Sequence, residues 1–257
     1  MWYARRMVSA EVLKLRRNKS QLITTLLMTV GVVVVYFAVV EAFHLYNPAV
    51  HGPAGGSANF SNVINILTFI GATGAIVVGA RAGSADQSTG VFRDQVATGR
   101  SRISLFAARV AGGSLFFLVF ILAALVLAVA GTFLFRSGLP VPTWSGIFRN
   151  SWVTVVVTLF NLLLALGLAS LTLSRSVTVG VLLVWTLFAQ RLLVRISALG
   201  GVRKAFPLAA EHALNPDARG PFGHVIPESV FTAVLVLVVW AVALLASGAW
   251  RTYSMDA

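Results

Sequence analysis

Residues 22–40 of the chain read LITTLLMTVGVVVVYFAVV, a run that contains no charged residue. Roughly twenty helical residues cross the ~30 Å hydrocarbon core of a bilayer. Inside lipid, every backbone N–H and C=O group must be hydrogen-bonded within its own element, so such a run is typical of a spanning helix. The basic stretch before it is too long for the start of a cleaved signal peptide. We therefore expect residues 22–40 to form the core of a permanent membrane helix.

Five further apolar runs follow along the chain, and short polar loops separate them. Hydrophobic residues make up 58% of the 257 residues and charged residues only 11%, whereas soluble domains carry about 25% charged residues. No polar segment is long enough to form a soluble domain of its own. The sequence thus predicts one all-α transmembrane domain over residues 1–257. Its six expected spans cover residues 21–43, 61–83, 104–135, 148–173, 176–199 and 227–250.

The positive charge of the chain indicates a membrane surface rather than nucleic acid. The formal net charge is +12, and basic residues gather beside the apolar runs, where anionic lipid attracts each of them by roughly 1 kcal/mol. Within residues 1–20, Ala4, Val8, Val12 and Leu15 share one stripe at helical spacing, which predicts an amphipathic helix in the headgroup layer. The distribution of Lys and Arg favours two cytoplasmic termini. An Arg-rich, Lys-poor composition favours a bacterial inner (plasma) membrane.

Several kinds of chemistry are missing from the sequence. Cysteine is absent, which excludes disulfides, thiolate metal sites and cysteine nucleophiles. There is no P-loop, no H-E-x-x-H and no G-x-S-x-G motif. No predicted span carries a histidine or a mid-membrane acid, which ion-coupled carriers and intramembrane proteases usually need. We therefore expect no catalytic residue and no cofactor bound by this chain.

A few polar residues fall within the predicted spans. Interhelical hydrogen bonds are the ordinary role of such amides, and snorkelling to the headgroups is the ordinary behaviour of arginines near a helix end. The alternative is a polar lining for a substrate pathway. Candidates for that lining are Asn65, Asn161, Gln190, Arg191 and Arg195.

A row of small residues in the second span also has two interpretations. Small residues every four positions let two helix backbones approach closely. They fit either packing within the chain or a seam between two subunits or beside a pathway, and spacing alone does not separate these. The row consists of Gly71, Ala75, Gly79 and Gly83.

All histidines fall on the predicted outer side, together with three glutamates. Spacings of three and four residues within this group are compatible with one metal ion, but isolated loop histidines are ordinarily interfacial side chains, and we expect no metal. The residues are His44, His51, His212, His224, Glu41, Glu211 and Glu228. The outer loop at residues 200–226 contains three prolines and is too long for a tight turn.

The most informative polar segment is the predicted inner loop at residues 84–103. Residues 83–102 read GSADQSTGVFRDQVATGRSR. Apolar and amide pairs spaced by four residues predict a short surface helix that ends near Gly99, since glycine after a helix fits a left-handed cap. Without further context, this segment would be a solvated basic loop beside lipid headgroups.

The basic N-terminal helix, the six spans and this inner loop together resemble the ABC-2 family of ATP-binding-cassette permeases. In that family the loop often contains an acid, Gly-Thr, a basic residue, a Gly or Pro turn, Ser-Arg and a later Lys or Arg. The matching residues are Gly90, Arg93, Gly99, Ser101, Arg102 and Arg109. The departures are Val91 where Thr is usual, Asp86 or Gln87 in place of Glu, and Arg100 where Pro is common.

The resemblance implies an ABC exporter that works by alternating access. A coupling helix at residues 87–98 would dock onto a separate ATPase subunit, two per complex, which would bind ATP and Mg. A second permease subunit, identical or related, would complete the pathway, residues 1–20 would form a connecting helix, and short helices within residues 200–226 would dip back into the membrane. The implied ATPase contacts are Asp86, Gln87, Gly90, Val91, Phe92, Arg93, Asp94 and Val96.

Two other functions stay open at the level of sequence. One is a membrane component that transports nothing: a scaffold, a sensor or an assembly factor. The other is an enzyme that acts on lipids through outer histidines and glutamates.

Overall fold

The chain folds as a bundle of long helices in a computed structural model, which describes residues 2–88, 99–215 and 228–254. In these ranges all regular secondary structure is helical. Six of the described helical segments are long and apolar enough to cross a membrane, which confirms the prediction of an all-helical chain with six potential spans. They are Lys19–Tyr46, Gly56–Ala85, Arg102–Leu134, Trp144–Thr172, Arg175–Arg195 and Val230–Ser254.

The first and fifth spans each contain a π-helical turn. The N-terminal helix α1 (Trp2–Arg17) leads into the first span, which consists of α2 (Lys19–Leu26), the π turn η1 (Leu27–Gly31) and α3 (Val32–Tyr46). The fifth span consists of α8 (Arg175–Val184), the π turn η2 (Trp185–Ala189) and α9 (Gln190–Arg195). The other elements are α4 (Gly56–Ser88), α6 (Arg102–Leu134), α7 (Trp144–Thr172), the 3-10 helix η3 (Ser197–Ala205), α10 (Pro207–Leu214) and α11 (Val230–Ser254).

Several predicted boundaries were wrong by a few residues, because polar caps or an extended residue set the helix ends. The Asn18 side chain accepts a hydrogen bond from Gln21 N at 3.0 Å, so α2 starts afresh after α1. Thr143 caps α7 by accepting from Gly146 N at 3.2 Å, and α7 therefore begins before the predicted residue 148. At the end of the fifth span, Ile196 is extended, so that span stops at Arg195 rather than at residue 199.

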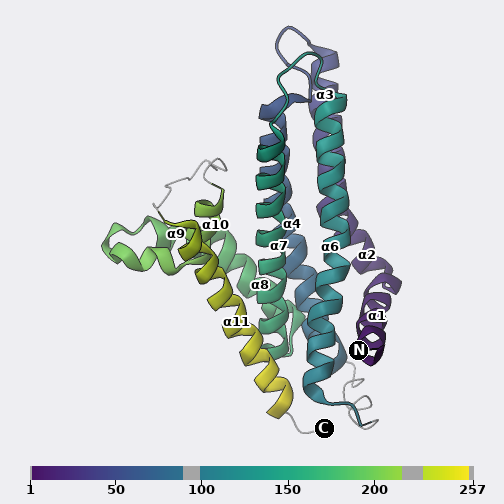
Figure 1. Ribbon diagram of the computed structural model, residues 1–257, viewed down its shortest axis with the longest axis vertical. Coiled ribbons are helices and arrows are strands. Elements are labelled where there is room, and N and C mark those ends of the chain that lie inside the picture. The colour runs from purple at the N-terminus through teal and green to yellow at the C-terminus, as the bar shows by residue number, and fades with distance from the viewer. Residues whose placement is uncertain (1, 89–98, 216–227, 255–257) are drawn as a thin grey trace.

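The centre of the fold is formed by α4, α6 and α7, which run side by side (Figure 1). The row of small residues in α4 lies inside this bundle. A Cβ atom at Gly79 would collide with the carbonyl oxygen of Leu162, and one at Gly83 would lie 2.5 Å from the carbonyl oxygen of Leu166. Because α7 occupies this face, the row serves packing within the chain rather than a seam between subunits.

Both described ends of the chain lie at the same end of the bundle as the start of α6 (Figure 1). Helix α1 packs on the first turns of α6, where Met7 contacts Leu105 and Ala108. At the start of α6, Arg102 Nη1 donates a hydrogen bond to the carbonyl oxygen of Tyr253 at 2.8 Å. If both termini are cytoplasmic, as the sequence predicts, the start of α6 lies on the cytoplasmic side as well.

Candidate functional site

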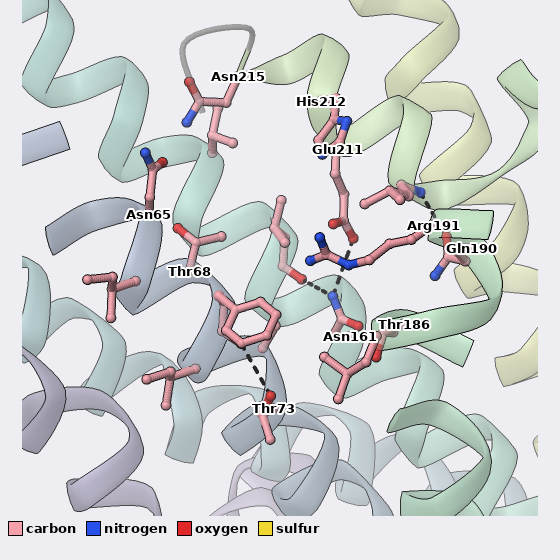
Figure 2. A pocket seen from close by; sticks show the side chains of 18 of the residues that line it. Asn65, Thr68, Thr73, Asn161, Thr186, Gln190, Arg191, Glu211, His212 and Asn215 are labelled. Carbon is pink, nitrogen blue, oxygen red and sulfur yellow. Dashed lines mark hydrogen bonds between the residues drawn. The ribbon is translucent and has the colours of Figure 1, made fainter. Parts of the chain in front are cut away.

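A cavity of about 990 Å³ lies between α4, α7, the fifth span and α10 (Figure 2). Most of its wall is apolar, and polar side chains gather where α7, α9 and α10 meet. On the side between α4 and the fifth span, the cavity-lining residues Ile66, Phe69 and Phe188 are also exposed on the surface of the chain. The cavity thus opens on an apolar face.

The short helix α10 closes one wall of the cavity because the outer loop folds back over the bundle. Proline at the first position of α10 suits a helix start, where the missing N–H costs nothing. The backbone N–H of Leu208 in the first turn donates to Oε1 of Gln190 at 2.8 Å. Just before α10, Trp240 Nε1 of α11 donates to the carbonyl oxygen of Ala205 at 2.9 Å. These two bonds fix α10 against the fifth and sixth spans.

Glu211 of α10 points into the polar part of the cavity, where Asn161 and Arg191 point toward it (Figure 2). The amide Nδ2 of Asn161 donates to Oε1 of Glu211 at 3.4 Å and to the carbonyl oxygen of Val157 at 2.9 Å. The guanidinium of Arg191 lies 5.8 Å from the centre of the Phe69 ring, within the range of a cation–π contact. An acid, a cation and an amide therefore share one wall.

The sequence placed Glu211 in the outer loop, outside the predicted spans, and the structure brings it against the fourth span. Glu211 meets Asn161, which lies roughly 17 Å from the Thr172 end of α7 at 1.5 Å per residue. Its place in the cavity was not predicted, because it arrives on a short helix that is not itself a span. Proline followed by an apolar turn, at residues 207–210, was the local signal.

Burial controls the charge of the two titratable groups on α10, which lies outside the spanning segments. Glu211 keeps some accessible surface where it faces the cavity, but the surrounding protein excludes most water from its carboxylate. That burial raises the pKa of Glu211 to about 7, while the Asn161 hydrogen bond and the charge of Arg191 act in the opposite direction. Burial and Arg191 also lower the pKa of His212. Near neutral pH, Glu211 is thus about half protonated and His212 is neutral.

Four of the five residues named as a candidate pathway lining come together at this cavity: Asn65, Asn161, Gln190 and Arg191. Arg195, one turn beyond Arg191, is exposed and is not among the lining residues. Sequence reasoning missed Thr68, Thr73, Thr186 and Glu211, which also line the cavity. A threonine within an apolar run gives little signal, because its hydroxyl can bond to the preceding turn of its own helix. Thr68 and Thr186 both do so.

The predicted ATPase contacts fall mostly beyond what the structure describes. Gly90, Val91, Phe92, Arg93, Asp94 and Val96 lie outside the described residues. Asp86 and Gln87 belong to the last turn of α4. Arg109, the last residue of the family resemblance, is buried in α6 with an exposed fraction of 1%.

Among the predicted outer histidines and glutamates, His44 and Glu41 serve local structure. His44 Nδ1 lies 2.7 Å from the carbonyl oxygen of His51, and Glu41 Oε2 accepts from Ala54 N at 3.1 Å. Both contacts tie down the turn between α3 and α4. Across residues 2–88, 99–215 and 228–254, no three His, Asp or Glu side chains are grouped to hold a metal ion, and His224 lies outside these ranges.

The six apolar helices and the cavity among them fit a multi-pass helical membrane protein. No protein-family model and no curated protein matches this chain.

Proposed function

We propose that this chain is the permease subunit of an ABC exporter, which moves its substrate across the membrane with energy from a separate ATPase. The observation that carries the proposal is the cavity of about 990 Å³ among the apolar helices. The cavity opens on an apolar face, so a ligand can reach it through that face. A cavity with polar groups among apolar helices suits a substrate that pauses during its passage.

The energy for transport has to come from a partner, since the sequence contains no P-loop. The end of the bundle that holds α1, the start of α6 and the last turn of α11 is the docking end in this proposal. Helix α4 ends at Ser88 and α6 begins at Arg102 at that end, and the predicted inner loop at residues 84–103 includes the segment that connects them. Two ATPase subunits, carrying ATP and Mg, would push on this connection when they close, and the chain itself would hydrolyse nothing.

A second permease subunit would complete the pathway across the open face of the cavity. Transport by alternating access requires helices that change shape between inward and outward states. The π turn η2 is suited to that, because π turns in helices occur frequently at functional sites. Its residues Thr186, Leu187 and Phe188 line the cavity. Movement of the fifth span would therefore reshape the cavity directly.

Affinity purification of the tagged chain from membranes of its own host tests the proposal. We expect a P-loop ATPase to co-purify, and we expect Phe92→Ala to weaken its capture and uncouple ATP hydrolysis from transport. Phe148→Ala is the matched control, because Phe148 is exposed in the first turns of α7, at the opposite end from α1. Wild-type transport in Phe92→Ala would remove Phe92 from the contact.

Two results would replace the proposal. A chain that folds and captures no ATPase under gentle detergent conditions would be a scaffold, a sensor or an assembly factor. Lipid-modifying activity of the purified chain without nucleotide would indicate an enzyme.

A further inference from the structure

The charged groups of the cavity differ in whether their charge can be removed. Arg191 is always protonated in proteins, so its positive charge is permanent. Glu211 on the opposite helix is held near its titration midpoint. Among the described residues, the cavity therefore contains one fixed cation and one acid whose charge can be switched off by a proton.

Other titratable groups around Glu211 do not change this balance within the described residues. His212, next to it on α10, is neutral near pH 7 because burial lowers its pKa. Tyr36 of α3 lines the cavity and hydrogen-bonds through its hydroxyl to Asn59 at 2.8 Å. Helices α7 and α11 bring no charged side chain to the cavity wall. Charged side chains on the neighbouring elements that do not line the cavity include Glu41, Arg81, Arg149, Arg175, Arg195, Arg203 and Lys204.

We propose that the cavity binds amphipathic anions, which carry an apolar body and one acidic headgroup, with the headgroup at Arg191 and a proton taken up by Glu211. The inference rests on the proposed function, since it names the substrate class of the same cavity. It uses only groups that line the cavity and face one another in Figure 2.

The cavity can accept a negatively charged headgroup at a lower free-energy cost than a positively charged one. A cationic headgroup needs the ionised form of Glu211 and also faces Arg191, whose charge it cannot avoid. An anionic headgroup gains from Arg191, and its repulsion by Glu211 disappears once Glu211 is protonated. Because the carboxyl is near its midpoint at neutral pH, that protonation costs little free energy. The same wall thus discriminates against cations and adapts to anions.

The rest of the wall suits the apolar body. Ile66, Phe69, Ile76, Leu187 and Phe188 line the cavity away from the polar cluster. The volume of about 990 Å³ lies near the upper end of the range for small-molecule sites, which runs from roughly 300 to 1,000 Å³. Phe69 lies beneath the guanidinium of Arg191, so the headgroup site and the apolar site adjoin.

Two fluorescent probes that differ in one group test the proposal. 1-Anilinonaphthalene-8-sulfonate carries a sulfonate on the ring system of the neutral probe N-phenyl-1-naphthylamine. Each is titrated onto the full chain in nanodiscs of zwitterionic lipid at pH 6 and pH 8, with empty nanodiscs subtracted. We expect the anionic probe to bind about tenfold more tightly at pH 6, as the fraction of protonated Glu211 rises. The neutral probe should bind equally at both pH values.

Single-residue variants test whether Arg191 and Glu211 cause the preference for the anionic probe. Arg191→Gln should weaken binding of the anionic probe at least tenfold, because the charge-assisted hydrogen bond to the headgroup is lost, and it should leave the neutral probe unaffected. Arg191→Lys should retain most of the preference. Arg195→Gln, one turn away and outside the cavity lining, is the control and should bind both probes as the wild type does. Glu211→Gln should bind the anion tightly at both pH values.

Unchanged binding of the neutral probe shows that a variant is folded, so loss of the anion alone is specific. Equal binding of the anion at both pH values, or in Arg191→Gln, would overturn the proposal. The titration uses no ATPase, so it tests the substrate class separately from the exporter function. Capture of an ATPase without an anion preference would refute only the substrate class, and an anion preference without an ATPase would refute only the exporter.

Discussion

The close packing of α4 on α7 predicts that Gly83→Ala destabilises the protein, although alanine is the better helix former. The new Cβ would lie 2.5 Å from the carbonyl oxygen of Leu166 and 2.8 Å from the Cβ of Ala169. An ordinary C···O contact is about 3.3 Å or longer, so the two helices would have to separate by nearly an ångström. Both atoms belong to or directly adjoin the backbone of α7, and no flexible side chain can move aside.

The size of the effect follows from two opposing contributions. Replacing glycine by alanine within a helix stabilises it by up to about 1 kcal/mol. Forcing an extra methyl group into a tightly packed contact costs typically about 1–3 kcal/mol. Ser170 Oγ also donates to the carbonyl oxygen of Gly83 at 3.3 Å, and separation of the helices would break that bond. We expect a net loss of about 2 kcal/mol, which corresponds to a fall of roughly 5 °C in Tm.

Thermal unfolding in detergent, followed by size-exclusion chromatography of heated samples, measures this loss. Gly180→Ala is the matched control, because Gly180 also lies in an apolar helix but its Cβ would meet nothing within 4 Å. The control should melt at or above the wild-type temperature. If Gly83→Ala did the same, α4 and α7 would not pack as described. A change of oligomeric state without a change in Tm would instead place this glycine row between subunits.

Two further predictions concern α10. The pKa of Glu211 is about 7 in the folded chain, whereas its ordinary value is 4.5, so between these pH values the folded state binds more protons than the unfolded state. Protonation of Glu211 therefore stabilises the folded state by up to about 3 kcal/mol. This contribution is complete below pH 4.5 and is lost as the pH rises through 7. Tm of the wild type should therefore fall between pH 5 and pH 8, and Glu211→Gln should remove most of that fall; equal slopes would contradict the burial of Glu211. Gln190→Leu should cost about 1–3 kcal/mol by leaving Leu208 N–H without an acceptor. Hydrogen exchange at residues 208–214 should accelerate, and unchanged exchange would show that this bond does not hold α10.

The spans were predictable because hydropathy measures a local property, the transfer of each side chain out of water. Residues 22–40 and the five later runs each carry that signal by themselves. Helix ends were less predictable, since a cap depends on one polar residue outside the apolar run. Thr143 is such a cap, and it moved the start of α7 ahead of the apolar segment.

The candidate site was predictable only in part, because its geometry depends on long-range contacts. Asn161, Gln190 and Arg191 stood out as polar residues in apolar runs, and the structure brings them to one cavity. Glu211 did not stand out as a residue of this cavity, because its partner Asn161 is 50 positions earlier in the chain. For residues 200–226 the sequence predicted an outer loop, and the family resemblance implied short helices within it. The bonds of Leu208 with Gln190 and of Trp240 with Ala205, which hold α10 in the bundle, connect residues far apart in the chain.

The polar cluster is costly to the fold, and this cost supports a role in function. Ionisable groups at membrane depth are expensive, and replacing buried charged groups by apolar residues of similar size is often neutral or stabilising. Helices α9 and α10 nevertheless bring Arg191 and Glu211 to a cavity of about 990 Å³, which is large enough for a ligand. The cavity and its charges therefore favour a ligand that both binds Arg191 and fills the volume.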